Sequence, residues 1–241
     1  MTDSAPESDD AGTVTRLRGV RLAAAKHMIT AWSAPAFHVA IDIEMTAANS
    51  VKTRTPGSTI SDVILRACAR ALVDQPTLNA WYEDDFNIRT FATANVGLAV
   101  AAPQGLVVPV IHNADQLTLP EIVESRREAV DRSRSATLKR EDITGGTFTI
   151  SNLGMLGVVQ FDAILNPPQV AILAIAATRN EYIRTPHGAR WRPLCRFTLT
   201  CDHRAVDGAA AALFLNRLKE LLESDELDLI QAVDEVPPRS V

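Results

Sequence analysis

Strand-like and helix-like segments mix along this chain without a regular strand–helix repeat, and their order constrains the possible folds most strongly. Alternation of apolar and polar side chains predicts strands at 37–45, 95–101, 106–111, 146–151, 170–177 and 196–201. Apolar residues at helical spacing predict helices at 16–32, 59–72, 118–130 and 209–223. A doubly wound sheet needs strict alternation of strands and helices, so the sequence predicts an α+β fold instead.

The length and composition suit one large globular domain or two small ones. The chain has 241 residues, 46% of which are apolar, a fraction that can fill a sizeable core. The formal net charge is −5 and shows no basic footprint, so we expect no nucleic-acid partner. No apolar run has the length of a membrane span, so we expect no membrane partner either.

The three cysteines are odd in number, and none of them stands in Cys-x-x-Cys spacing. Such usage is typical of reduced thiols in a cytoplasm and argues against a disulfide scaffold or a zinc site. The first ten residues are acidic and polar, which does not match a secretory signal. The sequence therefore predicts a cytoplasmic protein without a bound metal.

The segment that joins the last predicted strand to the last predicted helix is rich in polar and turn-forming residues. It contains His203, four residues before Asp207. An imidazole titrates near neutrality and suits a general base, and a carboxylate one helical turn away can orient that base or hold its loop. The spacing alone also fits a helix-capping Asp207 beside a structural His203. The strand alternation, when continued, places His203 on the buried side.

Other polar residues have simpler interpretations. Cys201 permits a thiolate–imidazole pair with His203, but its apolar strand phase favours a buried structural cysteine. Asp42 and Glu44 occupy the polar face of a half-buried strand, where we expect them to be solvated.

Ser151 lies at the end of a strand-like run, beside a glycine-rich turn. A serine in this position can donate a hydrogen bond to a developing oxyanion. No Gly-Lys-Ser/Thr follows, which disfavours a phosphate loop, and Gly-x-Ser-x-Gly does not surround the serine. The local pattern alone favours the alternative interpretation, a serine that caps the turn.

Five sequence motifs stand in order between residues 95 and 208. They are Asn95-Val-Gly-Leu-Ala-Val-Ala, Gly105-Leu-Val-Val-Pro-Val-Ile, Gly145-Gly-Thr-Phe-Thr-Ile-Ser-Asn-Leu-Gly, Ile164-Leu-Asn-Pro-Pro-Gln-Val-Ala-Ile-Leu and Asp202-His-Arg-Ala-Val-Asp-Gly. In this order they closely resemble the catalytic domain of the dihydrolipoamide acyltransferases, the core component of 2-oxo acid dehydrogenase complexes. The resemblance covers roughly residues 16–229, and residues 21–28 resemble the family's opening helix.

The resemblance implies a chloramphenicol-acetyltransferase-like sandwich with a mixed sheet and flanking helices. It implies trimers with active-site channels between subunits, and acyl exchange between a dihydrolipoyl thiol and coenzyme A. By motif, His203 is the general base, Ser151 the oxyanion donor and Asp207 the residue that stabilises the active-site loop by pairing with Arg21. Thioester exchange needs a base and an oxyanion donor but no metal, which agrees with these roles.

Two further positions, Asn152 and Gly208, are assigned by the same motifs to structural support of the site. The Ser-Asn-Leu-Gly-Met form of the Ser151 loop resembles pyruvate-type members, so we expect an acetyl group to be transferred. If the protein is an enzyme, the alternative to acetyl transfer is a stand-alone transferase of a succinyl, branched-chain or biosynthetic acyl group. A non-catalytic structural core of a dehydrogenase complex is the alternative from another class.

We expect a disordered acidic leader at 1–13, the catalytic domain at 14–229 and a C-terminal tail at 230–241. The family's usual lipoyl and subunit-binding domains cannot be placed in this sequence. The lipoyl group is therefore expected in trans, from a lipoyl-bearing protein or a component of a dehydrogenase complex. The expected assembly is a homotrimer, because the tail should hinder growth into a larger hollow particle, which is the alternative.

Overall fold

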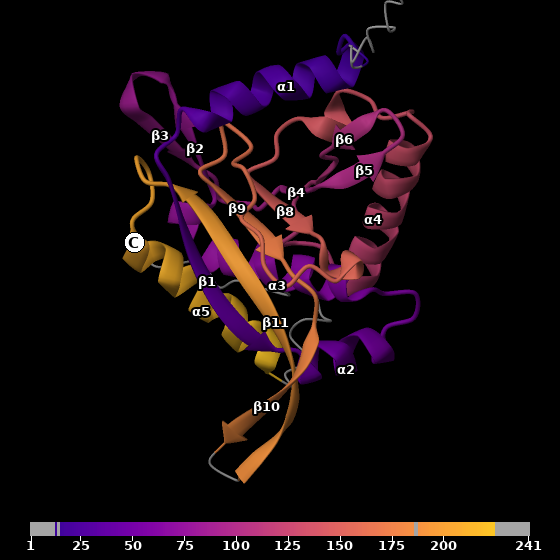
Figure 1. Cartoon of the computed structure of the whole chain (residues 1–241), viewed down its shortest axis with the longest axis vertical. Helices are drawn as coiled ribbons and strands as arrows, with labels where there is room; N and C mark the ends of the chain where they lie inside the picture. Colours follow the sequence, from indigo (N-terminus) through magenta and orange to yellow (C-terminus); the bar gives the residue numbers. More distant parts are fainter. Residues whose placement is uncertain (1–12, 14, 186–187, 225–241) are drawn as a thin grey trace, which may run out of the picture.

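The computed structural model describes residues 13, 15–185 and 188–224. Its largest element is a seven-stranded mixed sheet (Figure 1). Its strands are β1 (Ala36–Glu44), β4 (Val96–Leu98), β7 (Val110–Ile111), β8 (Phe148–Asn152), β9 (Ala171–Ile175), β10 (Arg179–Thr185) and β11 (Gly188–Asp202). The strand order is β1-β11-β9-β8-β4-β7, and β10 pairs with β11 outside that path. Strand β8 runs parallel to both neighbours, whereas β11 runs antiparallel to β1 and β9.

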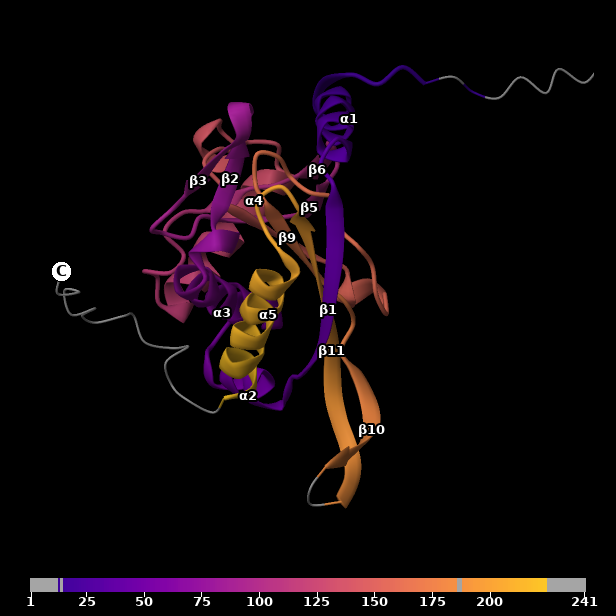
Figure 2. The same cartoon turned by 90° about the vertical axis from the view of Figure 1, so that its left-hand side faces the viewer.

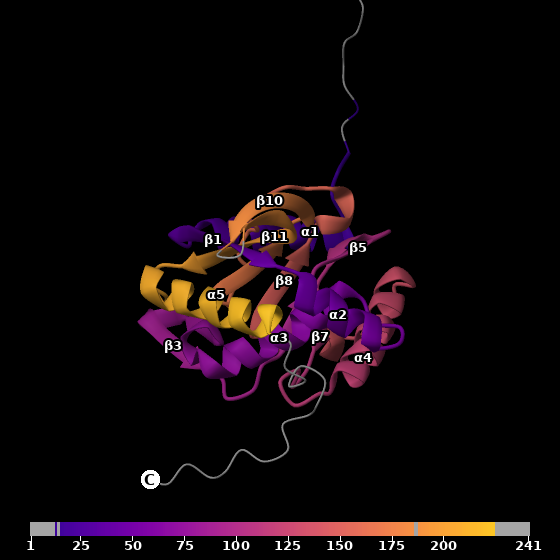
Figure 3. The same cartoon turned by 90° about the horizontal axis from the view of Figure 1, so that it is seen from below.

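Two of the helices cover one face of this sheet. The helices are α1 (Gly19–Trp32), α2 (Thr46–Arg54), α3 (Ile60–Asp74), α4 (Leu119–Arg134) and α5 (Gly208–Glu223). Helices α3 and α5 lie side by side against the sheet (Figures 2 and 3). Helix α1 lies across one end of the molecule, and the β10–β11 hairpin projects from the other end. No helix within the described ranges is long and apolar enough to cross a membrane.

The core lies between the sheet and these helices. Alternate residues of β11, Phe197, Leu199 and Cys201, are fully buried in one cluster with Phe214 and Leu215 of α5. This arrangement buries the apolar stripe that the sequence predicts for the last helix, since strand and helix each present one apolar face. The predicted α+β class with a mixed sheet is therefore confirmed.

Several details differ from the sequence-based expectation. Strand β10 and helix α2 were not anticipated, and β11 begins at Gly188 rather than at residue 196. The predicted strands at 95–101 and 106–111 each divide between two sheets, because β4 pairs with β7 while β5 (Val100–Ala102) and β6 (Gly105–Val107) form a small separate sheet. A second small sheet joins β2 (Ala80–Glu83) to β3 (Asn87–Thr90). The expected leader and tail lie essentially outside the described residues.

A buried ion pair joins α3 to α4. The Asp62 side chain is completely buried, and one of its oxygens accepts hydrogen bonds from the Thr59 backbone N–H and hydroxyl, each at 2.7 Å. The other oxygen accepts from the Arg126 guanidinium. Asp62 thus completes the capping box of α3 and also neutralises a cation on α4.

We expect Asp62→Ala to lower the free energy of unfolding by about 2–4 kcal/mol, because it removes the capping box and leaves the Arg126 cation largely buried without its partner. Urea unfolding followed by circular dichroism, at one fixed protein concentration, measures the change. Arg89→Ala is the control, since it breaks the exposed Glu83–Arg89 pair and should leave the midpoint nearly unchanged. Equal effects of the two substitutions would contradict a structural role for the buried pair.

Candidate active site

The turn after β11 carries His203 to the surface. Its backbone N–H donates to the Pro35 carbonyl at 3.0 Å, which extends the β1–β11 ladder by one residue. Its ring packs on Phe37 with centroids 4.5 Å apart. The predicted burial of His203 is wrong, because the chain leaves the strand here and the side chain is exposed. Across the described part of the chain, the His203 imidazole makes no hydrogen bond.

Asp207 stands at the N-cap of α5, where its carboxylate accepts the Ala210 N–H at 2.8 Å. The helix begins at Gly208, and the capping interpretation of Asp207 is confirmed. Arg21 lies exposed on α1, which packs against β6. Within one chain, no ion pair between described residues joins Arg21 to Asp207, so the structure does not bring this predicted pair together.

Ser151 lies near the end of β8, half-buried. Phe148 and Ile150 face the helix-covered core, so Ser151 faces the opposite side of the sheet. The next residue, Asn152, donates to the Ser61 hydroxyl of α3 at 3.0 Å and accepts the Gly154 N–H at 2.8 Å. Asn152 therefore fixes the turn that follows Ser151.

Ser151 and His203 of one chain lie at opposite ends of the sheet. The ladder sets Ser151 level with Ala174 and Thr198, and His203 is five residues further along β11. Five residues of about 3.3 Å and two strand spacings of about 4.8 Å place the two residues roughly 19 Å apart. A site that contains both side chains therefore needs two copies of the chain.

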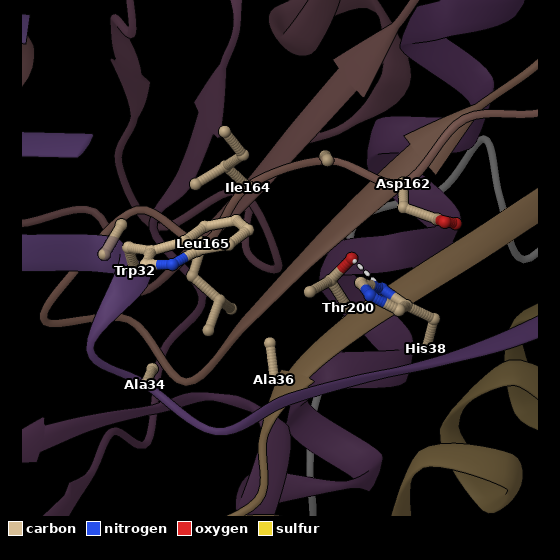
Figure 4. A pocket seen from close by; sticks show the side chains of 10 residues that line it. Trp32, Ala34, Ala36, His38, Asp162, Ile164, Leu165 and Thr200 are labelled. Atoms are coloured by element: carbon tan, nitrogen blue, oxygen red, sulfur yellow. Dashed lines mark hydrogen bonds between the residues drawn. The ribbon is translucent and has the colours of Figure 1, made fainter. Parts of the chain in front are cut away.

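A cavity of about 360 Å³ opens on the face of the sheet that Ser151 shares (Figure 4). Trp32 and Leu165 close one side of it, and His38 and Thr200 line the other. The His38 Nδ1 and Thr200 Oγ1 atoms are 3.0 Å apart and come from directly paired positions of β1 and β11. Periodicity places His38 on the polar face of its strand but does not reveal which strands become neighbours.

Two other interpretations of polar residues are settled by burial and register. Cys201 is fully buried, and desolvation raises its pKa to about 12, which confirms the structural-cysteine interpretation. The expectation that Asp42 is merely solvated is wrong. Asp42 lies opposite Arg196 and accepts two hydrogen bonds from it, at 2.8 and 2.7 Å. These bonds lower the pKa of Asp42. Among the described residues, no cluster of three His, Cys, Asp or Glu side chains is placed to hold a metal ion.

The sequence matches a family model described as 2-oxoacid dehydrogenases acyltransferase (catalytic domain) over residues 9–230. One relative is the dihydrolipoyllysine-residue acetyltransferase component of the pyruvate dehydrogenase complex, mitochondrial, from Schizosaccharomyces pombe. It is 38% identical over 214 residues, which cover 85% of this chain and 43% of that protein. The chain thus spans less than half the length of this curated relative.

Solved structures give the same picture. A probable dihydrolipoamide acetyltransferase from Listeria monocytogenes 4b F2365 superposes with a TM-score of 0.84 at 31% identity, covering 90% of this chain and 97% of that one. The Azotobacter vinelandii dihydrolipoamide acetyltransferase superposes with a TM-score of 0.83 at 28% identity, covering 92% of this chain and 97% of that one. That structure comes from work on the role of a serine, a histidine and an asparagine in the catalytic mechanism of that enzyme. Chloramphenicol acetyltransferase shares the fold, which confirms the predicted architecture. It superposes with a TM-score of 0.56 at 14% identity, covering 82% of this chain and 94% of that one.

We expect Asp207→Ala to lower the free energy of unfolding by about 1 kcal/mol, because the Ala210 N–H loses its acceptor at the start of α5. Asp207→Asn keeps an oxygen in that position and should stay within a few tenths of a kcal/mol of the wild type. Urea unfolding at one protein concentration measures both, with the exposed Glu124→Ala on α4 as a control carboxylate without a capping bond. If the asparagine variant were as unstable as the alanine variant, the charge and not the cap would be the stabilising feature.

Proposed function

The chain belongs to the 2-oxoacid dehydrogenase acyltransferase family, and we propose that it transfers an acetyl group between a dihydrolipoyl thiol and coenzyme A. The spacing of three residues carries the proposal. In the Azotobacter vinelandii enzyme, the serine and histidine under study are separated by the same number of residues as Ser151 and His203. The asparagine follows that histidine by the same number of residues as Asp207 follows His203. The acetyl group is supported by the Schizosaccharomyces pombe relative, an acetyltransferase component.

The proposed reaction is a thioester exchange. The His203 imidazole accepts the proton of the incoming thiol, and the resulting thiolate attacks the carbonyl carbon of the acyl thioester. The Ser151 hydroxyl donates a hydrogen bond to the oxyanion of the tetrahedral intermediate. Collapse of the intermediate breaks the original carbon–sulfur bond, and the departing thiolate takes the proton back from the imidazolium. An imidazole suits this task because its pKa lies close to neutral pH.

The proposed site is shared between two copies of the chain. Ser151 and His203 of one chain are too far apart to act on one carbonyl group, so each His203 works with the Ser151 of a neighbouring copy. A homotrimer with such sites between subunits is the assembly we propose, following the resemblance to the family. The structure of the cubic core of the pyruvate dehydrogenase complex, 29% identical with a TM-score of 0.80, supports further association with complex components.

The cavity beside His38 supports the proposed substrates. It lies on the face of the sheet that carries Ser151. Thr200 of β11 is level with Thr149 of β8, which stands two residues before Ser151 on the same face. Its walls are mostly apolar, with one polar side at His38, Asp162 and Thr200. This lining suits an aliphatic arm that contains an amide and ends in a thiol, which is the chemistry common to dihydrolipoyl-lysine and the pantetheine arm of coenzyme A. We propose that the lipoyl group is supplied in trans, in the cytoplasm.

We expect Ser151→Ala to lower kcat by about 10²- to 10³-fold through loss of the oxyanion donor. His203→Ala should lower kcat by about 10²- to 10⁴-fold through loss of the base. The assay follows acetyl-coenzyme A with free dihydrolipoamide, and succinyl- and isobutyryl-coenzyme A test the acyl group. Undiminished turnover in His203→Ala would refute the mechanism. A folded wild-type trimer without turnover for any of the three thioesters would instead favour the non-catalytic core.

Mixed oligomers of two inactive variants test whether the site is shared between subunits. Subunits of Ser151→Ala and His203→Ala, unfolded and refolded together in equal amounts, should recover about a quarter of the wild-type activity. In random oligomers about one site in four combines an intact Ser151 from one copy with an intact His203 from another. Each variant refolded alone is the control. Recovery of no activity from a mixture that forms oligomers would contradict a shared site.

A further inference from the structure

Arg204 directly follows His203, and its side chain folds back onto Asp202. Its Nε lies 2.9 Å from Oδ1 of Asp202 and its Nη2 lies 2.6 Å from Oδ2, which is a bidentate arrangement. The backbone N–H of Arg204 donates to the same carboxylate at 3.0 Å. Asp202 is only 3% exposed, whereas the Arg204 side chain is 35% exposed, so solvent screens the pair from the Arg204 side only. The two neighbours of His203 are therefore tied to each other across it.

Tyr82 supports Arg204 from the other side. The guanidinium carbon lies 3.9 Å from the centroid of the Tyr82 ring, in a cation–π contact. The ring belongs to β2, and the Tyr82 backbone N–H donates to the Pro168 carbonyl at 2.8 Å. The hydrogen bonds to Asp202 raise the pKa of Arg204, so the guanidinium remains charged. Arg204 is thus held between a buried carboxylate and an aromatic face on a separate sheet.

The His203 ring depends on its backbone for orientation. Its only described side-chain neighbour in ring contact is Phe37, and none of the described residues gives the imidazole a hydrogen bond. The turn itself is secured at the Asp202 carbonyl, which accepts the N–H groups of Ala205 and Val206 at 3.1 and 3.0 Å. Any rotation of the turn would therefore move the ring directly.

We propose that Asp202, Arg204 and Tyr82 form a clamp that positions the His203 ring for proton transfer, with Arg204 as the central positioning residue. The proposal rests on the proposed function, because it takes His203 as the general base. A lysine can pair with Asp202, but it can neither bind the carboxylate through two parallel bonds nor stack its charge as a plane on Tyr82. The clamp therefore requires the guanidinium and an aromatic ring, not merely a cation and an apolar neighbour.

We expect Arg204→Lys and Tyr82→Leu each to lower kcat by about 10- to 100-fold, with both KM values within about twofold of the wild type. Tyr82→Phe keeps the aromatic face and should retain kcat within about twofold. Arg217→Ala is the matched control, because the Arg217 side chain has the same 35% exposure and pairs with Asp74 away from the turn. Full activity of both Arg204→Lys and Tyr82→Leu would overturn the clamp.

A second measurement does not depend on turnover. The ring current of Phe37, at 4.5 Å, shifts the ring signals of His203 in a spectrum of protein carrying ¹³C-labelled histidine, and His203→Ala identifies those signals. We expect Arg204→Lys and Tyr82→Leu to move them, and Tyr82→Phe and Arg217→Ala to leave them in place. Unchanged signals in Arg204→Lys would overturn the clamp even if kcat fell. A wild type without acyl transfer would refute the proposed function alone, since the signals would still decide whether the clamp exists.

Discussion

The antiparallel pairing of β1 with β11 is the constraint on which the rest of the molecule depends. Nine consecutive register pairs, from Ala36 with Asp202 to Glu44 with Leu194, join two segments that are far apart in the sequence. Closing so long a loop costs conformational entropy, which the buried residues of both strands offset by packing against α5. The same ladder ends at the Pro35 carbonyl, where it fixes the backbone of His203. One pairing therefore stabilises the sheet and places the candidate base.

The direction of the strands explains why a site that contains both Ser151 and His203 needs two copies of the chain. Because β8 runs parallel to β9 and β11 runs antiparallel to both, the residues that follow β8 and those that follow β11 emerge at opposite ends of the sheet. Ser151 and His203 both lie where their strands end, so no loop movement of ordinary size can bring them together in one chain. Activity of the proposed kind is consequently linked to assembly, and a monomer would contain two half-sites rather than one weak site.

The parts of the fold that follow from local patterning were predictable, and the parts that depend on register were not. The apolar stripe of α5 is one example, and the start of α4 is another, because Thr118 and Glu121 stand three residues apart and form a capping box there. The Asp42–Arg196 pair and the cavity at His38 arise from neighbouring strands whose pairing no local period specifies. The motifs likewise predicted Ser151 and His203 as site residues but not the distance between them, since distance within a sheet depends on strand order. Arg204 was missed because a charged residue beside a candidate base resembles any solvated cation.

The relation between His203 and Asp207 shows how one spacing can serve two physical purposes. In the single chain, the Asp207 carboxylate is engaged by the Ala210 N–H and gives the imidazole no hydrogen bond. A cap needs only an oxygen acceptor, so the start of α5 does not by itself require a charge at this position. The geometry of His203 must therefore be set by its other surroundings, which are the Pro35 carbonyl, the Phe37 ring and the Asp202–Arg204 pair. The short His-x-x-x-Asp spacing thus reflects where a helix begins after a strand, while the position of the base depends on the residues that flank it on either side.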